Sequence, residues 1–401
     1  MYLHGTATPR AGDGVARLPD KGAHSVTSLK RRESTDDPYR MMRSRTSLPP
    51  IVLVVCVFAG LDCSAGGAGR IAGGLPNPQC SFANPVSTGA DPWVVRHDSL
   101  YYFVKSSNNR IWVARSSTLT GVAAAPATPV WTAPDTGWNQ GNVWAPELHF
   151  MDGRWYIYYA AGRRGSPFTT QRAGVLQSAG ADAFGPYADR GMLYTGDSAG
   201  TGTGNRWAID LTVAQLGSQR YAVWSGWEKN ATTDKAPQQL YIAPMANPWT
   251  IAANRVMLSA PVESWERGPE LDLLEGPEFL QRDGDVFLLY STRDSWRKEY
   301  ALGQLRLKSR AADPLNPANW VKSGPVFEGN ADVFGVGHAS FTTSPDGSEH
   351  WIVYHSKTSA VPGWDRDVRL QRFTWSVSGA PVFGTAVRTG AGVPRPAGEC
   401  P

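Results

Sequence analysis

The sequence predicts an all-β fold, a five-bladed β-propeller, because one unit recurs about every 55–65 residues between residues 84 and 384. Each unit begins with a short apolar strand, followed by a turn and a strand rich in aromatic and β-branched residues. Alternation with a period of two residues is frequent, and no long apolar period of 3.6 residues occurs, so strands are favoured over helices. The turns fall near Ser99, Gly153, Ser218, Gly284 and Gly347.

The expected strands follow in chain order. First strands are expected at 92–95 and 211–216. Strands after the turn are expected at 100–106, 220–226 and 285–291, and the second and fifth units keep the same frame at 145–161 and 338–356. Third strands are expected at 110–116, 173–179, 239–245, 301–307 and 368–375. Five units of about four strands each favour a propeller, whose innermost strands line a central axis.

Three carboxylates recur near one place in the repeat. Asp91 and Asp210 each lie eight residues before their turn, and Glu275 lies nine residues before its turn. In a circular repeat such positions converge on the axis, which a β-sandwich, the alternative fold, does not explain. Two carboxylates that flank a sugar bond are the usual equipment of a glycosidase, and a third can raise the pKa of the acid. Glu147 and Glu278 are weaker candidates.

Composition supports a large folded domain and argues against a nucleic-acid partner. The 401 residues are 11% aromatic, with 16 Trp, 42 Gly and 30 Pro, which suits a core with many turns and aromatic side chains left for a binding surface. The net charge of +4 comes from the N-terminus, because residues 1–45 carry nine Lys and Arg against five Asp and Glu. A nucleic-acid binder should carry its basic excess on the folded domain.

The N-terminal segments predict export. An apolar run at 48–60 follows Arg43 and Arg45 and leads into small residues, so residues 41–79 are expected to be a signal peptide and a short linker. The run is short for a transmembrane helix; an uncleaved anchor is the alternative, and a lipoprotein is disfavoured because Asp62 precedes Cys63.

Residues 1–40 are polar, and they are either an extension or a stretch upstream of a true start at Met41 or Met42. The mature protein is expected to be a secreted or periplasmic monomer without stable membrane insertion.

Cysteine positions predict one disulfide. The cysteines are Cys56, Cys63, Cys80 and Cys400, and no pair has zinc-ligand spacing. Cys80 opens and Cys400 closes the predicted catalytic domain, residues 80–400. The first and last blades of a propeller are neighbours and export permits oxidation, so we expect a Cys80–Cys400 bond.

Five segments, taken together, resemble glycoside hydrolase family 43. They are ADPWV (90–94), NVWAPELHF (142–150), RWAIDLTV (206–213), LEGPEFL (274–280) and GHASFTTSPDG (337–347), and they occur in the order of that family. The resemblance implies a five-bladed propeller of inverting enzymes that act on arabinose- and xylose-containing polysaccharides. Carried over by motif, Asp91 is the general base, Glu275 is the general acid, and Asp210 tunes and orients the acid.

The same resemblance suggests further site residues. Arg369 in RDVRLQRF matches an arginine that contacts the sugar, with a surface ion pair as the alternative. His338 in GHASF matches a histidine that, in several members, lines a site for a calcium or sodium ion, although Ala339 replaces the usual Asn; a purely structural histidine is the alternative. No cofactor is expected to be required beyond this axial ion.

Three tryptophans lie within three residues of an axial motif position: Trp93, Trp144 and Trp207. Each could be a core residue, yet at least one is expected to line the pocket.

The function expected from these residues is an exo-acting, inverting α-L-arabinofuranosidase that acts on arabinan or arabinoxylan of the plant cell wall. The stretches 224–228 and 238–251 resemble arabinofuranosidases more than endo-arabinanases. A β-D-xylosidase or an endo-arabinanase of the same family, and a sugar-binding propeller without catalysis, remain alternatives. A retaining, invertase-like propeller is disfavoured, since its WMNDPNG-type motif is absent from the sequence.

Overall fold

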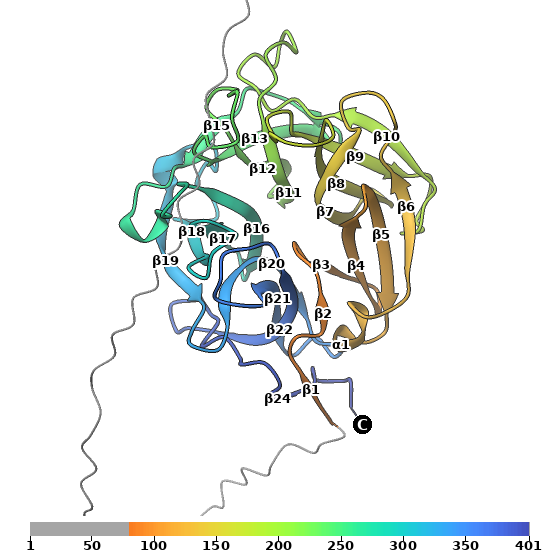
Figure 1. Ribbon diagram of the computed structural model, residues 1–401, viewed down its shortest axis with the longest axis vertical. Coiled ribbons are helices and arrows are strands. Elements are labelled where there is room, and N and C mark those ends of the chain that lie inside the picture. The colour runs from red at the N-terminus through yellow and green to blue at the C-terminus, as the bar shows by residue number, and fades with distance from the viewer. Residues whose placement is uncertain (1–79, 401) are drawn as a thin grey trace, which may run out of the picture. The chain divides into compact units, whose positions relative to one another are not determined.

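The computed structural model describes residues 80–400. In this part of the chain five antiparallel sheets surround a central axis (Figure 1), so the predicted five-bladed β-propeller is confirmed. The expected extension at 1–40 and the signal peptide and linker at 41–79 lie outside the described residues. Within residues 80–400, no helix has the length and apolar character needed to span a membrane.

Each blade places its first strand at the axis and its last strand at the rim (Figure 1). Blade 1 contains β3 (Trp93–His97), β4 (Leu100–Ser107), β5 (Arg110–Ser116) and β6 (Ala127–Thr132). Blade 2 contains β7 (Gly141–Met151), β8 (Arg154–Gly162), β9 (Arg172–Ser178) and β10 (Tyr187–Met192). Blade 3 contains β11 (Ala208–Leu216), β12 (Gln219–Gly226), β13 (Gln239–Asn247), β14 (Thr250–Ile251) and β15 (Val256–Ser259).

The last two blades complete the ring. Blade 4 contains β16 (Leu274–Arg282), β17 (Asp285–Thr292), β18 (Ala301–Leu307) and β19 (Trp320–Glu328). Blade 5 contains β20 (Phe334–Thr343), β21 (His350–Lys357), β22 (Arg366–Trp375), β23 (Pro381–Val382) and, from the N-terminal end, β2 (Ser87–Thr88). The described helices are single turns: α1 (Leu119–Val122), η2 (Ser264–Glu266) and η3 (Pro317–Asn319).

Both ends of the described chain close the ring at blade 5. Strand β2 pairs with β22, so a blade built mainly from C-terminal residues takes its outer strand from the N-terminal side. Beyond it, β1 (Ser81–Ala83) pairs with β24 (Gly392–Pro394). A disulfide joins Cys80 to Cys400, with the two Cα atoms 5.9 Å apart, which confirms the predicted bond.

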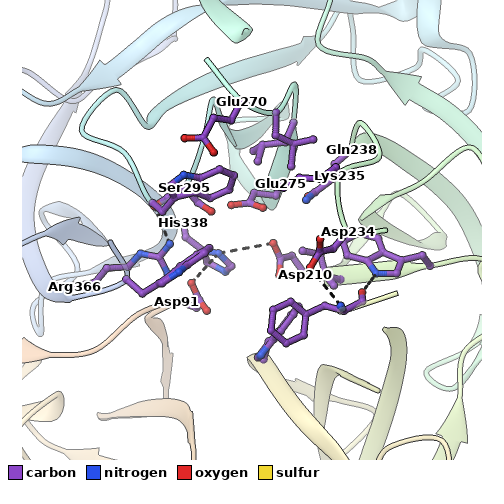
Figure 2. Close-up of a pocket in the computed structure, with 18 residues that line it drawn as sticks. Asp91, Asp210, Asp234, Lys235, Gln238, Glu270, Glu275, Ser295, His338 and Arg366 are labelled. Atoms are coloured by element: carbon purple, nitrogen blue, oxygen red, sulfur yellow. Dashed lines mark hydrogen bonds and ion pairs between the residues drawn. The ribbon is translucent and has the colours of Figure 1, made fainter. Parts of the chain in front are cut away.

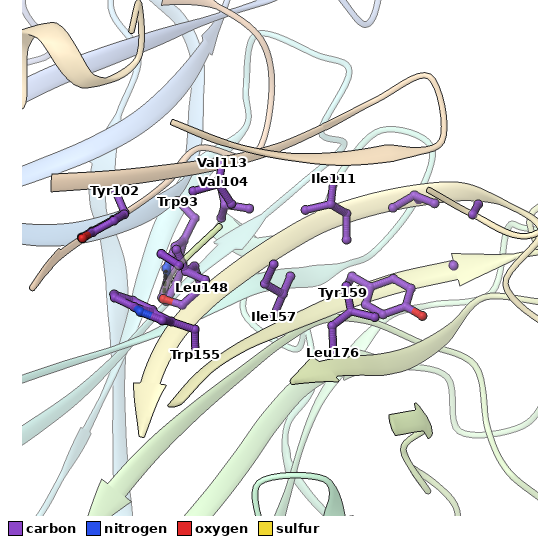
Figure 3. Close-up of a cluster of buried hydrophobic side chains, with 14 residues drawn as sticks. Trp93, Tyr102, Val104, Ile111, Val113, Leu148, Trp155, Ile157, Tyr159 and Leu176 are labelled. Atoms are coloured by element: carbon purple, nitrogen blue, oxygen red, sulfur yellow. Dashed lines mark hydrogen bonds between the residues drawn. The ribbon is translucent and has the colours of Figure 1, made fainter. Parts of the chain in front are cut away.

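The core lies between the blades, where each sheet packs against the next. Figure 3 shows the cluster between blades 1 and 2, in which Trp93 and Val104 face Leu148, Trp155 and Ile157. Comparable apolar clusters fill the other four junctions. Because a blade is covered on both faces, its central strands are buried almost throughout, as in β8 and β17, and burial of this apolar surface is the main stabilising contribution.

The innermost strands share a local distortion that shapes the axis. In four of them, β7, β11, β16 and β20, two successive residues face a single residue of the next strand, which is a β-bulge. One residue in each of these bulges has a positive φ, and so does the matching residue just before β3. The five φ angles lie between 41° and 53°. These residues are Asp91, Ala145, Asp210, Gly276 and His338.

This register corrects one detail of the repeat. Asp91 and Asp210 do occupy equivalent positions, but Glu275 does not, because Gly276 has the positive φ in blade 4. Glu275 precedes the bulge by one residue, which explains why it lies nine residues before its turn where the two aspartates lie eight. The residue of blade 5 at the shared position is His338.

Candidate active site

A pocket of about 610 Å³ lies at the axis, a size typical of small-molecule sites. Figure 2 shows Asp91, Asp210 and Glu275 reaching it from three different blades. The full lining consists of Asp91, Trp144, Phe168, Trp207, Ile209, Asp210, Asp234, Lys235, Gln238, Glu270, Leu271, Leu273, Glu275, Ser295, Trp296, His338, Trp364 and Arg366. The structure therefore brings together the three acids, two of the three tryptophans and His338.

His338 lies between the two equivalent aspartates. Its Nδ1 is 3.3 Å from Oδ1 of Asp91 and 3.9 Å from Oδ2 of Asp210. Its backbone N–H donates to Oγ of Ser291 at 2.7 Å, and this bond holds the His338 backbone against β17. The closeness depends on Gly276, because a Cβ there would stand 3.1 Å from the His338 ring. A side chain at position 276 would therefore force the His338 ring to shift.

Asp91 is held in the ionised form. Burial alone would raise its pKa, but His338, His355 and Arg366 outweigh that effect and hold the pKa well below its ordinary value. The backbone N–H of Asp91 donates to Nδ1 of His355 at 3.1 Å. Burial lowers the pKa of His355 to about 3, and among the neighbours that lower the pKa of Asp91 the largest effect comes from His338.

Glu275 and Asp210 form a pair of buried carboxyl groups whose pKa values are both raised. Burial is the main cause that raises the pKa of Glu275, to about 7, and the negative charge of Asp91 adds to it. Burial, then Glu275 and Asp91, also raise the pKa of Asp210 well above its ordinary value. Two buried carboxyl groups that interact in this way titrate as a unit.

Each member of the pair accepts a hydrogen bond from the protein. The N–H of Gly276 donates to Oδ2 of Asp210 at 2.9 Å and favours its ionised form. The hydroxyl of Tyr300 donates to Oε1 of Glu275 at 2.9 Å, which leaves Oε2 as the oxygen that can carry the proton. Both hydrogen bonds favour the ionised form of the carboxyl group that accepts them, and burial opposes this effect at both groups.

The three candidate tryptophans have different surroundings. Trp207 lies parallel to Trp227, with ring centroids 4.3 Å apart, and its indole N–H donates to the carbonyl of Phe168. Trp144 meets the ring of Phe168 edge to face at 5.0 Å, so both tryptophans form a fixed wall of the pocket. Trp93 lies in the core between blades 1 and 2 and not in the pocket, because its indole N–H donates to the carbonyl of Leu148 at 2.9 Å.

The arginine in the pocket is Arg366 and not Arg369. Arg369 is 2% exposed, and its guanidinium donates to Ser356, to the carbonyl of Val387 and to Thr389, all outside the pocket. Arg366 lies three residues earlier, at the first position of β22. It lines the pocket and donates to the carbonyl of Ser295 at 2.8 Å. The match to RDVRLQRF identified the correct strand but a residue outside the pocket.

The weaker acid candidates lie outside the pocket lining. The hydroxyl of Thr212 donates to Oε2 of Glu278 at 2.9 Å, and Oε2 of Glu147 is 3.0 Å from Nε2 of His149. Burial is the main cause that raises the pKa of both glutamates well above the ordinary value, and Glu278 adds to the shift at Glu147. They form an acidic pair, with Glu147 buried and Glu278 half-buried, and neither belongs to the pocket lining.

The axial ion suggested for His338 stays a prediction. Among residues 80–400, no group of three or more His, Cys, Asp or Glu side chains could hold a metal ion. Nδ1 of His338 is directed at two carboxylates (Figure 2), where it can donate a hydrogen bond. The observed contacts of His338 are therefore with the acids.

Several pocket residues were not anticipated from the sequence. Phe168, Asp234, Lys235, Gln238, Glu270, Ser295, Trp296 and Trp364 all lie in connections between strands. Only Trp364 carried a usable signal, as an aromatic residue two positions before Arg366.

A comparison with protein families identifies the family of this chain. The model of glycosyl hydrolases family 43 matches residues 82–381, most of the described chain. The chain belongs to glycoside hydrolase family 43.

Members of family 43 among the similar proteins carry arabinofuranosidase names. The chain is 36% identical to an extracellular exo-α-(1→5)-L-arabinofuranosidase of Streptomyces avermitilis, over 84% of the chain and 70% of that protein. It is 36% identical to α-L-arabinofuranosidase 43 of Humicola insolens, over 78% of the chain and 65% of that protein. The crystal structure of an α-L-arabinofuranosidase from Lactobacillus brevis matches with a TM-score of 0.69 and 33% identity, covering 77% of this chain and 98% of that one.

Proposed function

We propose that this family 43 member is an inverting α-L-arabinofuranosidase that removes terminal arabinofuranosyl residues from arabinan or arabinoxylan. The observation that carries the proposal is that Asp91, whose pKa is held low, and Glu275, whose pKa burial raises to about 7, converge on one pocket of about 610 Å³. The names of the similar proteins from Streptomyces avermitilis and Humicola insolens support arabinofuranose as the sugar.

The proposed reaction uses the two carboxyl groups on opposite sides of the scissile bond. Glu275 transfers its proton to the glycosidic oxygen as the bond from the anomeric carbon to that oxygen breaks. Asp91 accepts a proton from a water molecule as the water oxygen attacks the anomeric carbon from the other face. One water is consumed, and the acid and base regain their starting states when Asp91 releases a proton and Glu275 takes one up. This mechanism requires the carboxyl groups to stand roughly 6.5–9.5 Å apart.

The surrounding residues have supporting roles in this proposal. The negative charge of Glu275 raises the pKa of Asp210, and because this repulsion is mutual, Asp210 in this proposal favours the protonated form of Glu275 and orients it. Arg366 helps to keep Asp91 ionised. The wall of Trp144 and Trp207 offers aromatic faces to a sugar ring. An exo-acting enzyme needs a pocket that accepts a chain end, which fits the pocket at the axis.

We also propose that the protein is exported. The similar protein of Streptomyces avermitilis is named as extracellular, and a disulfide such as Cys80–Cys400 persists in oxidising compartments. The N-terminal apolar run provides the expected export signal.

The test is the product profile of the purified protein on debranched arabinan, α-1,5-linked arabino-oligosaccharides and arabinoxylan. We expect monomeric arabinose as the first product, and proton NMR of that product should show the inverted anomer. Glu275→Gln is the matched control for contaminating activity, since the substitution keeps the shape of the side chain. Release of xylose alone would favour a β-D-xylosidase, internal cleavage would favour an endo-arabinanase, and binding without turnover would favour a sugar-binding propeller.

A further inference from the structure

Trp364 is a large aromatic side chain that the fold exposes. It is 65% exposed, although it belongs to the pocket lining together with Asp91 and Glu275. An exposed indole of this size beside a binding pocket marks an interaction site more often than an isolated surface residue does. Trp364 belongs to the connection between β21 and β22, residues 358–365.

The backbone around Trp364 is fixed by a buried lysine. Lys357 is 3% exposed and its Nζ donates to the carbonyl of Gly363 at 2.7 Å. The N–H of Gly363 donates to the carbonyl of Trp296 at 2.9 Å, and the N–H of Thr358 donates to the carbonyl of Asp365 at 3.1 Å. These bonds tie the connection to blade 4, so the indole is positioned before any ligand arrives.

The rings of Trp364 and Trp296 form a two-sided rim. Their centroids are 5.5 Å apart and their planes are inclined by 44°. The guanidinium of Arg366 covers Trp364 at 5.1 Å from its centroid, and Nζ of Lys235 lies 5.1 Å from the centroid of Trp296. Since Arg366 covers one face of Trp364 and the residue remains largely exposed, the other face is open to a planar or ring-shaped ligand.

The rim lies on the side of the proposed general acid. Trp296 packs against Leu271, Leu273 and Tyr300, and Tyr300 donates to Glu275. Because Glu275 protonates the oxygen of the leaving group, the sugar that departs has to lie on this side of the pocket. The wall of Trp144 and Trp207 comes from blades 2 and 3 instead.

We propose that Trp364, supported by Trp296, is the binding platform for the sugar ring of the leaving group. The ligand is a neutral five- or six-membered sugar ring, whose C–H face stacks on the open face of the indole. This inference deepens the proposed function and rests on it. Trp364 would then favour a substrate whose leaving group is a sugar over one whose leaving group is a small alcohol, without touching the reacting atoms.

The test compares two substrates that differ only in the leaving group, α-1,5-linked arabinotriose and methyl α-L-arabinofuranoside. We expect Trp364→Ala to lower kcat/KM for arabinotriose roughly tenfold, mainly through KM, as is typical of the loss of one ring stack. The methyl glycoside has no second ring, so its kcat/KM should change less than about twofold. Trp364→Phe should recover part of the loss, since it restores an aromatic face.

Val361→Ala is the matched control, because Val361 is 69% exposed in the same connection and is not part of the pocket lining. This variant should leave kcat/KM for both substrates unchanged. An equal loss of kcat/KM on both substrates with Trp364→Ala, or no loss on either, would overturn the platform.

If the wild-type protein hydrolyses no arabinoside, the proposed function fails, and fluorescence titration with arabinotriose and xylotriose then decides the platform separately. Binding of either sugar that weakens in Trp364→Ala supports it, and binding that is absent in the wild type or unchanged in the variant overturns it.

Discussion

Tyr300→Phe should move the alkaline limb of the pH–rate profile upward. The substitution removes the hydroxyl that donates to Oε1 of Glu275 at 2.9 Å and leaves the ring, which lies against His355, in place. A hydrogen bond to a carboxylate favours the ionised form, so Tyr300 lowers the pKa of Glu275 from the value that burial alone would give. Without it, Glu275 should keep its proton to higher pH.

The size of the shift follows from the geometry. A buried hydrogen bond to a charged group contributes about 1.5–3 kcal/mol, and one pKa unit corresponds to about 1.4 kcal/mol. The pKa of Glu275 lies at about 7 in the wild type, so an upward shift of roughly one to two units is expected in the variant. In the proposed mechanism activity requires protonated Glu275, and the rate should therefore fall as pH rises through this pKa.

The assay is kcat/KM for an arabinofuranoside between about pH 4 and pH 10, because this ratio reports the groups of the free enzyme. Tyr354→Phe is the matched control, since Tyr354 is a buried tyrosine of blade 5 whose hydroxyl faces Gln371 and no carboxylate. It should leave the limb in place. A limb in Tyr300→Phe that stays fixed or moves to lower pH, in a protein with normal thermal unfolding, would refute the assignment of Glu275 as the acid or of Tyr300 as its donor.

Three further predictions concern the acids and the closure of the ring. Glu275→Gln should impair substrates with poor leaving groups far more than activated aryl glycosides, whereas Asp91→Asn should impair both classes equally; equal effects of both variants would contradict the division of roles. Asp210→Asn should remove a like charge and shift the alkaline limb downward, and an unmoved limb would mean that Asp210 only positions the acid. Reduction of the Cys80–Cys400 bond should lower the stability by at most about 5 kcal/mol, visible as a lower Tm, and an unchanged Tm would contradict it.

The fold was predictable because its signal is periodic. Alternation within strands and the recurrence of turns are visible in the sequence without knowledge of contacts, and they predicted first strands at 92–95 and 211–216, where β3 and β11 lie. The site was only partly predictable, because strand alternation does not specify which end of a strand meets the pocket. Arg366 and Arg369 illustrate this limit: three residues apart on β22, they lie on opposite faces of the blade, and only the first reaches the pocket.

The aromatic residues that line the pocket were less predictable from the sequence than the carboxylates at the axis. Trp144 and Trp93 both lie near axial motifs, yet one lines the pocket and the other packs between blades. Trp296 and Trp364 belong to connections, whose paths depend on single bonds such as Lys357 to Gly363 and not on any period. Conformations of this kind are set by tertiary contacts that a sequence pattern does not encode.

The positive φ angles at the axis explain why one repeat position could acquire catalytic side chains. A left-handed backbone costs a residue with a Cβ about 1–2 kcal/mol, yet Asp91, Ala145, Asp210 and His338 all adopt it. Only Gly276 avoids that cost, and its missing Cβ is what admits His338 beside the two aspartates. Since even Ala145 keeps the conformation, the β-bulge belongs to the fold and not to the chemistry. The propeller thus provides five strained positions around its axis, and in this chain two of them hold an aspartate and a third follows Glu275, the proposed general acid.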